Sequence, residues 1–133
     1  MLIDGFAKPN GLAFSRDQRF VYVTDSGCIS GNGDRHRVLT RAIYRYRIID
    51  TPDGPLVTDR PIFCVVTKGI PEGIKIDAQD RVWTATGAGL EVFSKHGAPL
   101  AVIPIAGGVR NFALTDDGGA YVMGETKLYR LDP

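Results

Sequence analysis

A short pattern that occurs three times along the chain constrains the fold more than any other feature. Each copy has a polar opening, an apolar stretch, a turn and two further apolar stretches. The copies open with Pro9-Asn10-Gly11-Leu12, Pro71-Glu72-Gly73-Ile74 and Arg110-Asn111-Phe112-Ala113. A repeat of this kind indicates one supersecondary unit that packs against its own copies. Short antiparallel strands repeated in this way form the blades of a β-propeller.

The apolar stretches are too short for helices and fit strands. The 16 glycines and 8 prolines separate them, and no segment keeps an apolar period of 3.6 residues over three turns. We therefore expect an all-β chain. The expected strands cover residues 11–14, 20–24, 42–48, 62–66, 73–76, 82–86, 90–93, 101–105, 111–114, 120–123 and 127–131.

The repeat divides the 133 residues into three four-stranded blades, at about 7–66, 70–105 and 109–133. Residues 62–66 and 101–105 supply the fourth, outer strand of the first two blades, whereas the third blade has none. Residues 1–6 precede Pro9 by the interval at which residues 63–66 precede Pro71. We therefore expect residues 1–6 to be an outer strand without a blade of its own.

Three blades do not close a ring, because propellers typically have about 4 to 8 blades. The simplest closed object is a homodimer in which residues 1–6 of each chain complete the third blade of the other. Each chain is then half of a six-bladed propeller. The alternative is that the chain is a fragment of a longer protein and opens at an internal methionine. The prediction of three blades is the same in both cases.

The charge balance argues against two classes of partner. The net charge is +1, and the basic residues are scattered rather than clustered. We therefore expect neither nucleic acid nor an anionic membrane as a partner. The N-terminal residues lack the features of a secretory signal, and no apolar run approaches the roughly 20 residues of a membrane helix. A cytoplasmic location is expected.

Several segments resemble one protein family. Residues 8–15 (KPNGLAFS) and 21–26 (VYVTDS) resemble a blade opening of the senescence-marker protein, gluconolactonase and regucalcin family. Residues 70–77 (IPEGIKID) and 81–85 (RVWTA) resemble its Pro-Asp-Gly stretch, and residues 111–113 with 125–130 resemble its closing blade. The resemblance covers the whole chain but only the C-terminal half of a usual member.

The resemblance implies a six-bladed propeller that hydrolyses sugar lactones or related esters. It also implies a divalent cation in the pore, held by a Glu of the first blade, an Asn and an Asp. Asn10 matches the metal-binding Asn, and Glu72 stands in the place of the Asp, which also serves as the base. The Glu of the first blade and a further substrate-facing Asn belong to the half that is not in this sequence.

The chemistry of these side chains suits a hard cation. Ca²⁺ takes about six to eight oxygen ligands from carboxylates, amide carbonyls and water, so it is the expected metal, with Zn²⁺, Mg²⁺ or Mn²⁺ as alternatives. Two protein ligands are too few, and a twofold dimer would bring Asn10, Glu72 and Asn111 of both chains to one pore. The change from Asp to Glu adds a methylene, which moves the carboxylate by about 1 Å and bears on catalysis more than on metal binding.

Three residues are candidates for substrate binding. Arg110 and Asn111 stand at the entrance of the third blade, and His36 lies in the longest insertion, which covers residues 26–40. Two of them have a simpler interpretation: Arg110 pairs with Asp116 or Asp117 on the surface, and His36 lies in a solvated loop. Asn10 likewise fits a turn residue next to Gly11, and Glu72 a solvated loop charge.

The sequence thus predicts a metal-dependent hydrolase of a lactone or related ester, with Glu72 as the catalytic base and a small-molecule substrate in the pore of a homodimer. An alternative is a cyclase or isomerase of small-molecule biosynthesis in the same pore, because fold does not fix function. A further alternative is a half-propeller that binds a ligand or serves as a scaffold without catalysis.

Overall fold

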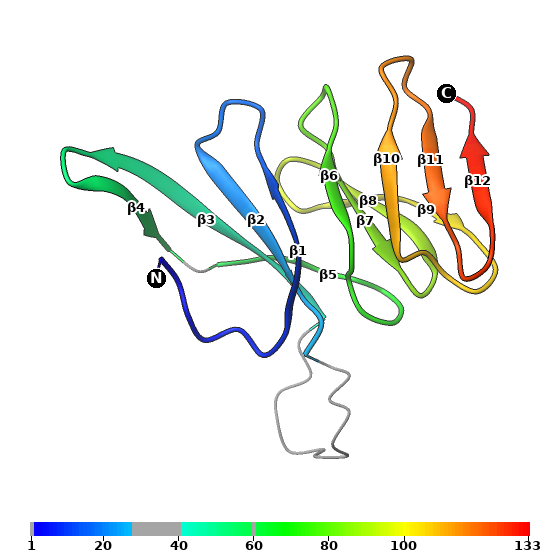
Figure 1. Ribbon diagram of the computed structural model, residues 1–133, viewed down its shortest axis with the longest axis horizontal. Coiled ribbons are helices and arrows are strands. Elements are labelled where there is room, and N and C mark those ends of the chain that lie inside the picture. The colour runs from blue at the N-terminus through cyan, green and yellow to red at the C-terminus, as the bar shows by residue number, and fades with distance from the viewer. Residues whose placement is uncertain (1, 28–40, 60) are drawn as a thin grey trace.

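The computed structural model describes residues 2–27, 41–59 and 61–133, and in these ranges all regular structure is β. Three antiparallel sheets follow one another along the chain and lie side by side (Figure 1). The expected all-β class and the division into three successive antiparallel sheets are confirmed. No helix in the described ranges has the length and apolar character needed to span a membrane.

The first sheet differs in its outer part from the four expected strands. The strand order is β1-β2-β3-β4, and β5 also pairs with β3. The strands are β1 (Pro9–Phe14), β2 (Phe20–Asp25), β3 (Ala42–Thr51), β4 (Gly54–Thr58) and β5 (Ile62–Val65).

The unexpected strand β4 exists because β3 has ten residues and its outer edge is long enough for two partners. The first part of β3 pairs with β5, and the part from Arg47 to Thr51 pairs with β4. A tight turn at Pro52-Asp53 joins β3 to β4, and Gly54, the first residue of β4, has a positive φ of 111°, which is common next to such turns. Residues 62–65 thus pair with the outer edge of β3 as expected, and β4 is an additional strand that was not expected.

The second sheet has the expected plan of four strands in chain order. The strands are β6 (Ile74–Ile76), β7 (Val82–Thr86), β8 (Gly89–Phe93) and β9 (Pro99–Pro104). Every residue of β8 is buried, because this strand lies inside the sheet and both of its faces are covered. Burial along β8 is therefore continuous rather than alternating.

The third sheet has three strands in the described part of the chain, β10 (Asn111–Leu114), β11 (Ala120–Met123) and β12 (Leu128–Leu131). Among the described residues no strand pairs with the outer edge of β12. Tyr121, Met123 and Leu128 of this sheet are all more than 40% exposed. One face and one edge of the third sheet are thus open in the single chain.

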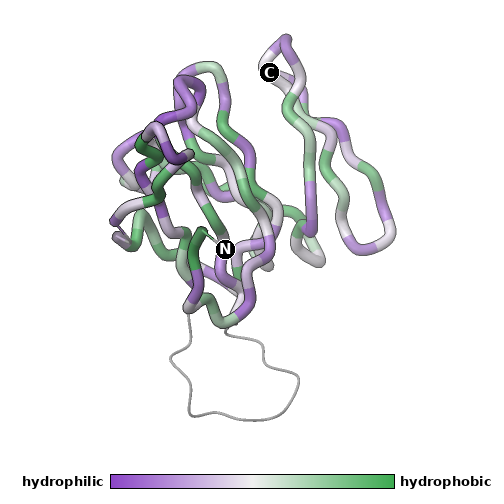
Figure 2. The backbone as a smooth tube through the Cα atoms, turned by 60° about the vertical axis from the view of Figure 1, so that its left-hand side comes forward, coloured by the Kyte–Doolittle hydropathy of each residue, from purple (hydrophilic) through white to green (hydrophobic). Residues whose placement is uncertain are grey.

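Apolar layers hold the sheets together, and hydrophobic segments occur in all three sheets (Figure 2). Tyr22 and Ile43 of the first sheet pack with Ile74 and Val82 of the second. A separate cluster joins the second sheet to the third through Leu90 and other residues, among them Ala85, Val109, Phe112 and Val122. Each sheet is therefore stabilised mainly by its neighbours, as expected of a repeat architecture.

The described N-terminal residues lie against their own chain. Residues 2–8 have no strand, and Ile3 and Phe6 pack against the face of the first sheet that turns away from the second. The Phe6 ring meets those of Tyr44 and Tyr46 edge-on, with centroid distances of 6.0 and 5.9 Å. The apolar side chains of this segment therefore cover apolar surface on their own chain, and the transfer of the segment to a partner's third blade stays a prediction.

We expect Val82→Ala to lower the free energy of unfolding by about 2 kcal/mol, because Val82 is fully buried between the first two sheets and its truncation leaves a cavity. The matched control is Val102→Ala. Val102 is 48% exposed on β9, so its truncation should change stability by less than about 0.5 kcal/mol. Urea titrations followed by tryptophan fluorescence measure both, and equal effects would contradict this packing.

Candidate functional site

The first strands of the three sheets, β1, β6 and β10, lie next to one another in that order. Glycines permit this approach. A Cβ atom on Gly11 would clash with the carbonyl oxygen of Glu72, and a Cβ atom on Gly73 would clash with Oδ1 of Asn111. The polar residues that precede or open these strands therefore come together at one end of the inner strands. We call this end the entrance.

The main chain of Glu72 is held by two hydrogen bonds. Its N–H donates to the carbonyl of Ala85 at 2.8 Å, and its own carbonyl accepts from the hydroxyl of Thr24 at 2.9 Å. Thr24 is fully buried, and its Oγ1 also accepts from the N–H of Gly11 at 2.7 Å. Hydrogen bonds to the first and second sheets thus set where the Glu72 side chain begins.

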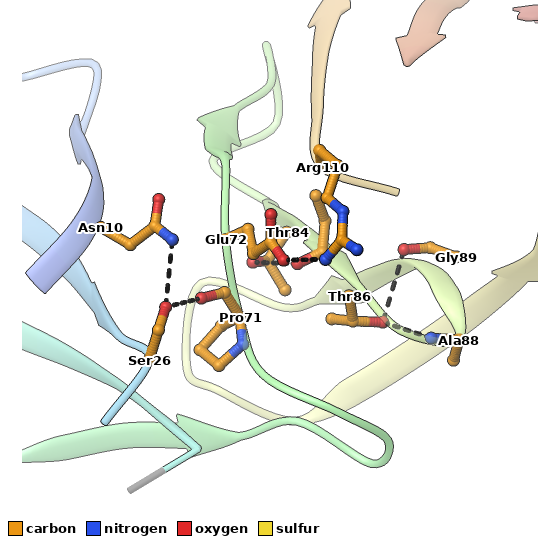
Figure 3. Close-up of polar contacts among 10 residues, drawn as sticks. Asn10, Ser26, Pro71, Glu72, Thr84, Thr86, Ala88, Gly89 and Arg110 are labelled. Carbon is orange, nitrogen blue, oxygen red and sulfur yellow. Dashed lines mark hydrogen bonds and ion pairs between the residues drawn. The ribbon is translucent and has the colours of Figure 1, made fainter. Parts of the chain in front are cut away.

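Asn10 is exposed at the start of β1, and its amide has a defined orientation. Its Nδ2 donates to the hydroxyl of Ser26 at 3.2 Å, and that hydroxyl donates to the carbonyl of Pro71 at 2.8 Å (Figure 3). Since the amide nitrogen is used, Oδ1 is the atom that is left to bind a cation or a substrate. Ser26 was not among the predicted site residues, although the polar pair Asp25-Ser26 directly after a strand was a signal that it holds other groups.

Asp25 is a buried carboxylate close to the entrance, but its oxygens bind backbone. It is 1% exposed and accepts from the N–H groups of Ala7, Lys8 and Gly27 at 2.9–3.0 Å. These three bonds anchor the end of the N-terminal segment and the chain after β2. Asp25 therefore has a structural role at the end of β2.

Glu72 and Arg110 form an ion pair across the entrance. Nη1 of Arg110 donates to Oε1 of Glu72 at 2.6 Å (Figure 3). The Glu72 side chain is 14% exposed, whereas that of Arg110 is 63% exposed. Arg110 was expected to bind a substrate or to pair with Asp116 or Asp117. Its partner is instead the expected catalytic carboxylate, and Asp117 pairs with Arg130 at 3.4 Å.

Asn111 lies beside Gly73 at the start of β10 and is exposed. Its Oδ1 accepts from the N–H of Phe112 at 2.9 Å. A backbone hydrogen bond links the starts of β6 and β10, because the N–H of Gly73 donates to the carbonyl of Arg110 at 3.1 Å. The other substrate-binding candidate, His36, lies outside the described residues.

The described donors match a divalent cation in type but not in number. Oδ1 of Asn10 and the carboxylate of Glu72 are oxygen ligands of the kind that Ca²⁺ prefers. Within the ranges that the structure describes, no group of three or more His, Cys, Asp or Glu side chains is placed to hold a metal ion. The chain by itself therefore offers part of a ligand set, and one of its members is engaged by Arg110.

Comparison with known proteins assigns the chain to a fold and a family. Residues 1–115 match the family model described as the SMP-30/Gluconolactonase/LRE-like region. The chain is 32% identical over 114 residues to lactonohydrolase oryL of Aspergillus oryzae, a match that covers 75% of this chain and 25% of that protein. The chain thus spans about a quarter of the length of the curated relatives that it matches.

Solved structures agree. A gluconolactonase from Xanthomonas campestris superposes with a TM-score of 0.80 at 26% identity, over 98% of this chain and 39% of that one. A regucalcin from Agrobacterium tumefaciens, described as a calcium-binding protein, superposes with a TM-score of 0.71 at 20% identity, over 98% and 47%. The three sheets therefore correspond to part of a gluconolactonase propeller, and the assignment to its C-terminal half stays a prediction. The chain belongs to the SMP-30/gluconolactonase/LRE-like family.

Proposed function

We propose that this chain contributes the entrance described above to a metal-dependent hydrolase of a lactone or related ester. The observation that carries the proposal is the Glu72 carboxylate, which is largely shielded from solvent. The main chain of Glu72 is held at the entrance by the hydroxyl of Thr24 and the carbonyl of Ala85. The names of the relatives support the reaction class, since oryL is a lactonohydrolase and the Xanthomonas protein a gluconolactonase.

Each entrance residue has a role in this proposal. Oδ1 of Asn10 and the carboxylate of Glu72 would hold the divalent cation, with Ca²⁺ favoured because a family structure is described as a calcium-binding protein. When bound, such a cation polarises the lactone carbonyl and lowers the pKa of a water molecule. Glu72 accepts the proton from that water as it attacks. Arg110, Asn111 and His36 bind the substrate.

A second copy of the chain is the proposed source of the missing ligands. The outer face of the first sheet exposes Leu12 and Phe14, at 62% and 52%, and the third sheet exposes Met123 and Leu128, at 47% and 68%. Large apolar side chains at both ends of a stack of sheets favour a head-to-tail ring, which covers both ends at once. In such a homodimer the two entrances face one pore.

The exchange of N-terminal strands would complete this ring. In the described chain no strand pairs with the outer edge of β12. An exposed strand edge of this kind can pair with a strand of another chain. Ala7 and Lys8 stay bound to Asp25, so residues 2–6 would swing out from that anchor. Their apolar contacts with the first sheet would be replaced by backbone bonds to the partner's β12.

Removal of the metal should abolish lactone hydrolysis. We expect excess EDTA to remove activity on an aldonolactone and added Ca²⁺ to restore it. Glu72→Ala should lower kcat/KM at least about 100-fold, because it removes both the base and a metal ligand. Asn10→Ala should lower metal content and activity together.

Glu125→Ala is the matched control for these variants. It removes an exposed carboxylate from the loop between β11 and β12, so it should keep full activity and metal content. Hydrolysis that persists in Glu72→Ala and Asn10→Ala with unchanged metal content would refute the proposed site. Calcium binding without turnover of any lactone would instead indicate a binding module, and conversion of another ligand would indicate the cyclase or isomerase alternative.

The mass in solution tests the ring. Light scattering should give twice the chain mass of 14.5 kDa. Leu128→Asp should shift the protein to the monomer and remove activity, because a charge would then replace an apolar side chain at the joint. Val102→Asp, a similar change on the exposed β9 away from the joint, should leave the mass unchanged. An active monomer would contradict the shared site.

A further inference from the structure

The ion pair between Arg110 and Glu72 occupies the carboxylate that the proposed cation needs. It is also unlike the other ion pairs of the described residues, which lie within one sheet or turn, because it joins the second sheet to the third. Its carboxylate is mostly shielded, whereas its guanidinium is mostly exposed. One partner of the pair is therefore fixed, and the other is free to turn toward solvent.

Backbone hydrogen bonds hold the main chain of Arg110 in place whether or not its side chain pairs with Glu72. The carbonyl of Arg110 accepts from the N–H of Gly73, and the N–H of Arg110 donates to the carbonyl of Met123, both at 3.1 Å. Only the side chain has to move for the pair to open. A divalent cation bound to Glu72 and the positive guanidinium repel each other at such short range. Cation binding and the ion pair are thus alternatives at the same carboxylate.

We propose that Arg110 couples cation binding at Glu72 to the binding of a carboxylate-bearing ligand at the entrance. In the free chain Arg110 pairs with Glu72 and lowers the affinity of the site for the cation. An anionic ligand offers the guanidinium another carboxylate, in a planar arrangement that allows two parallel hydrogen bonds. Arg110 then leaves Glu72, and the cation binds more tightly.

The chemical class of this ligand follows from the proposed function, on which this step rests. Attack of water on the carbonyl carbon of a lactone breaks the bond to the ring oxygen. The products are a carboxylate, a hydroxyl group on the former ring oxygen and a released proton. The product is therefore a hydroxy acid, whereas the lactone is neutral. Through this coupling the bound product raises the affinity for the cation, and the bound cation raises the affinity for the product, since linkage is reciprocal.

Calcium titrations of Arg110→Gln test the proposal. The variant keeps a polar side chain but removes the charge, so we expect it to bind Ca²⁺ about fivefold or more tightly than the unaltered protein. Arg110→Lys keeps the positive charge near Glu72, so its Ca²⁺ affinity should stay within about twofold of that of the unaltered protein. Arg81→Gln is the matched control, because it breaks the pair with Asp77 at the opposite end of β6 and should not change the affinity. Thermal unfolding checks that all variants fold.

The second arm adds gluconate as the hydroxy acid and the neutral polyol sorbitol as its control. Free Ca²⁺ is read with an electrode, because hydroxy acids also bind calcium. Gluconate should raise the Ca²⁺ affinity of the unaltered protein about fivefold and leave that of Arg110→Gln unchanged, and sorbitol should act on neither.

Two results would overturn the proposal. One is equal Ca²⁺ affinity in Arg110→Gln and the unaltered protein, including no binding by either. The other is a gluconate effect that persists without the Arg110 charge. Lactone hydrolysis decides the proposed function separately. Tighter Ca²⁺ binding by Arg110→Gln in a protein without hydrolysis would support the coupling and refute the hydrolase. Hydrolysis with no effect of the Arg110 variants on Ca²⁺ binding would support the hydrolase and refute the coupling.

Discussion

The close approach of β1, β6 and β10 is the constraint on which the rest of this structure depends. It requires positions without a side chain, and Gly11 and Gly73 supply them. Once the strands meet, the buried hydroxyl of Thr24 bridges the first sheet to Glu72, and Gly73 bonds to Arg110. The same spacing lets the apolar faces of successive sheets meet behind the inner strands. Packing and the position of the polar entrance therefore share one cause.

Much of this fold was predictable, because each copy of the repeat contains its own turn signals and apolar stretches. The three sheets and the inner strands followed from that local information. Strand β4 did not, because it has no counterpart in the other copies, although the Asp53-Gly54 dipeptide at its start is a strong hairpin signal. The position of the N-terminal segment in the single chain was not predictable for another reason. Its apolar residues do not specify which apolar surface they cover. In the structure, Ile3 and Phe6 pack against the first sheet of their own chain.

At the entrance the sequence indicated which residues meet but not how they bind one another. Asn10, Glu72 and Asn111 open equivalent units, so equivalent positions in space were expected for them. The hydroxyl of Ser26, which orients the Asn10 amide, belongs to a different strand end and carries no repeat signal. The repeat pattern also did not predict which carboxylate pairs with Arg110. Asp117 is nearer in sequence, yet Glu72, 38 residues away, is the carboxylate that the strand geometry presents.

The unequal exposure of the Glu72–Arg110 pair decides whether it is a permanent link or an exchangeable one. Breaking a pair that is buried on both sides costs about 3–5 kcal/mol, since an uncompensated charge is left behind. Pairs on the surface contribute only about 0–1 kcal/mol, because water stabilises the separated ions. Arg110 is 63% exposed and hydrates when it leaves, so most of the cost of opening falls on Glu72. A divalent cation or water can stabilise the carboxylate of Glu72 once the pair has opened, and an anionic ligand can stabilise the guanidinium of Arg110. The pair is therefore strong enough to orient Glu72 in the free chain and weak enough to yield to ligands.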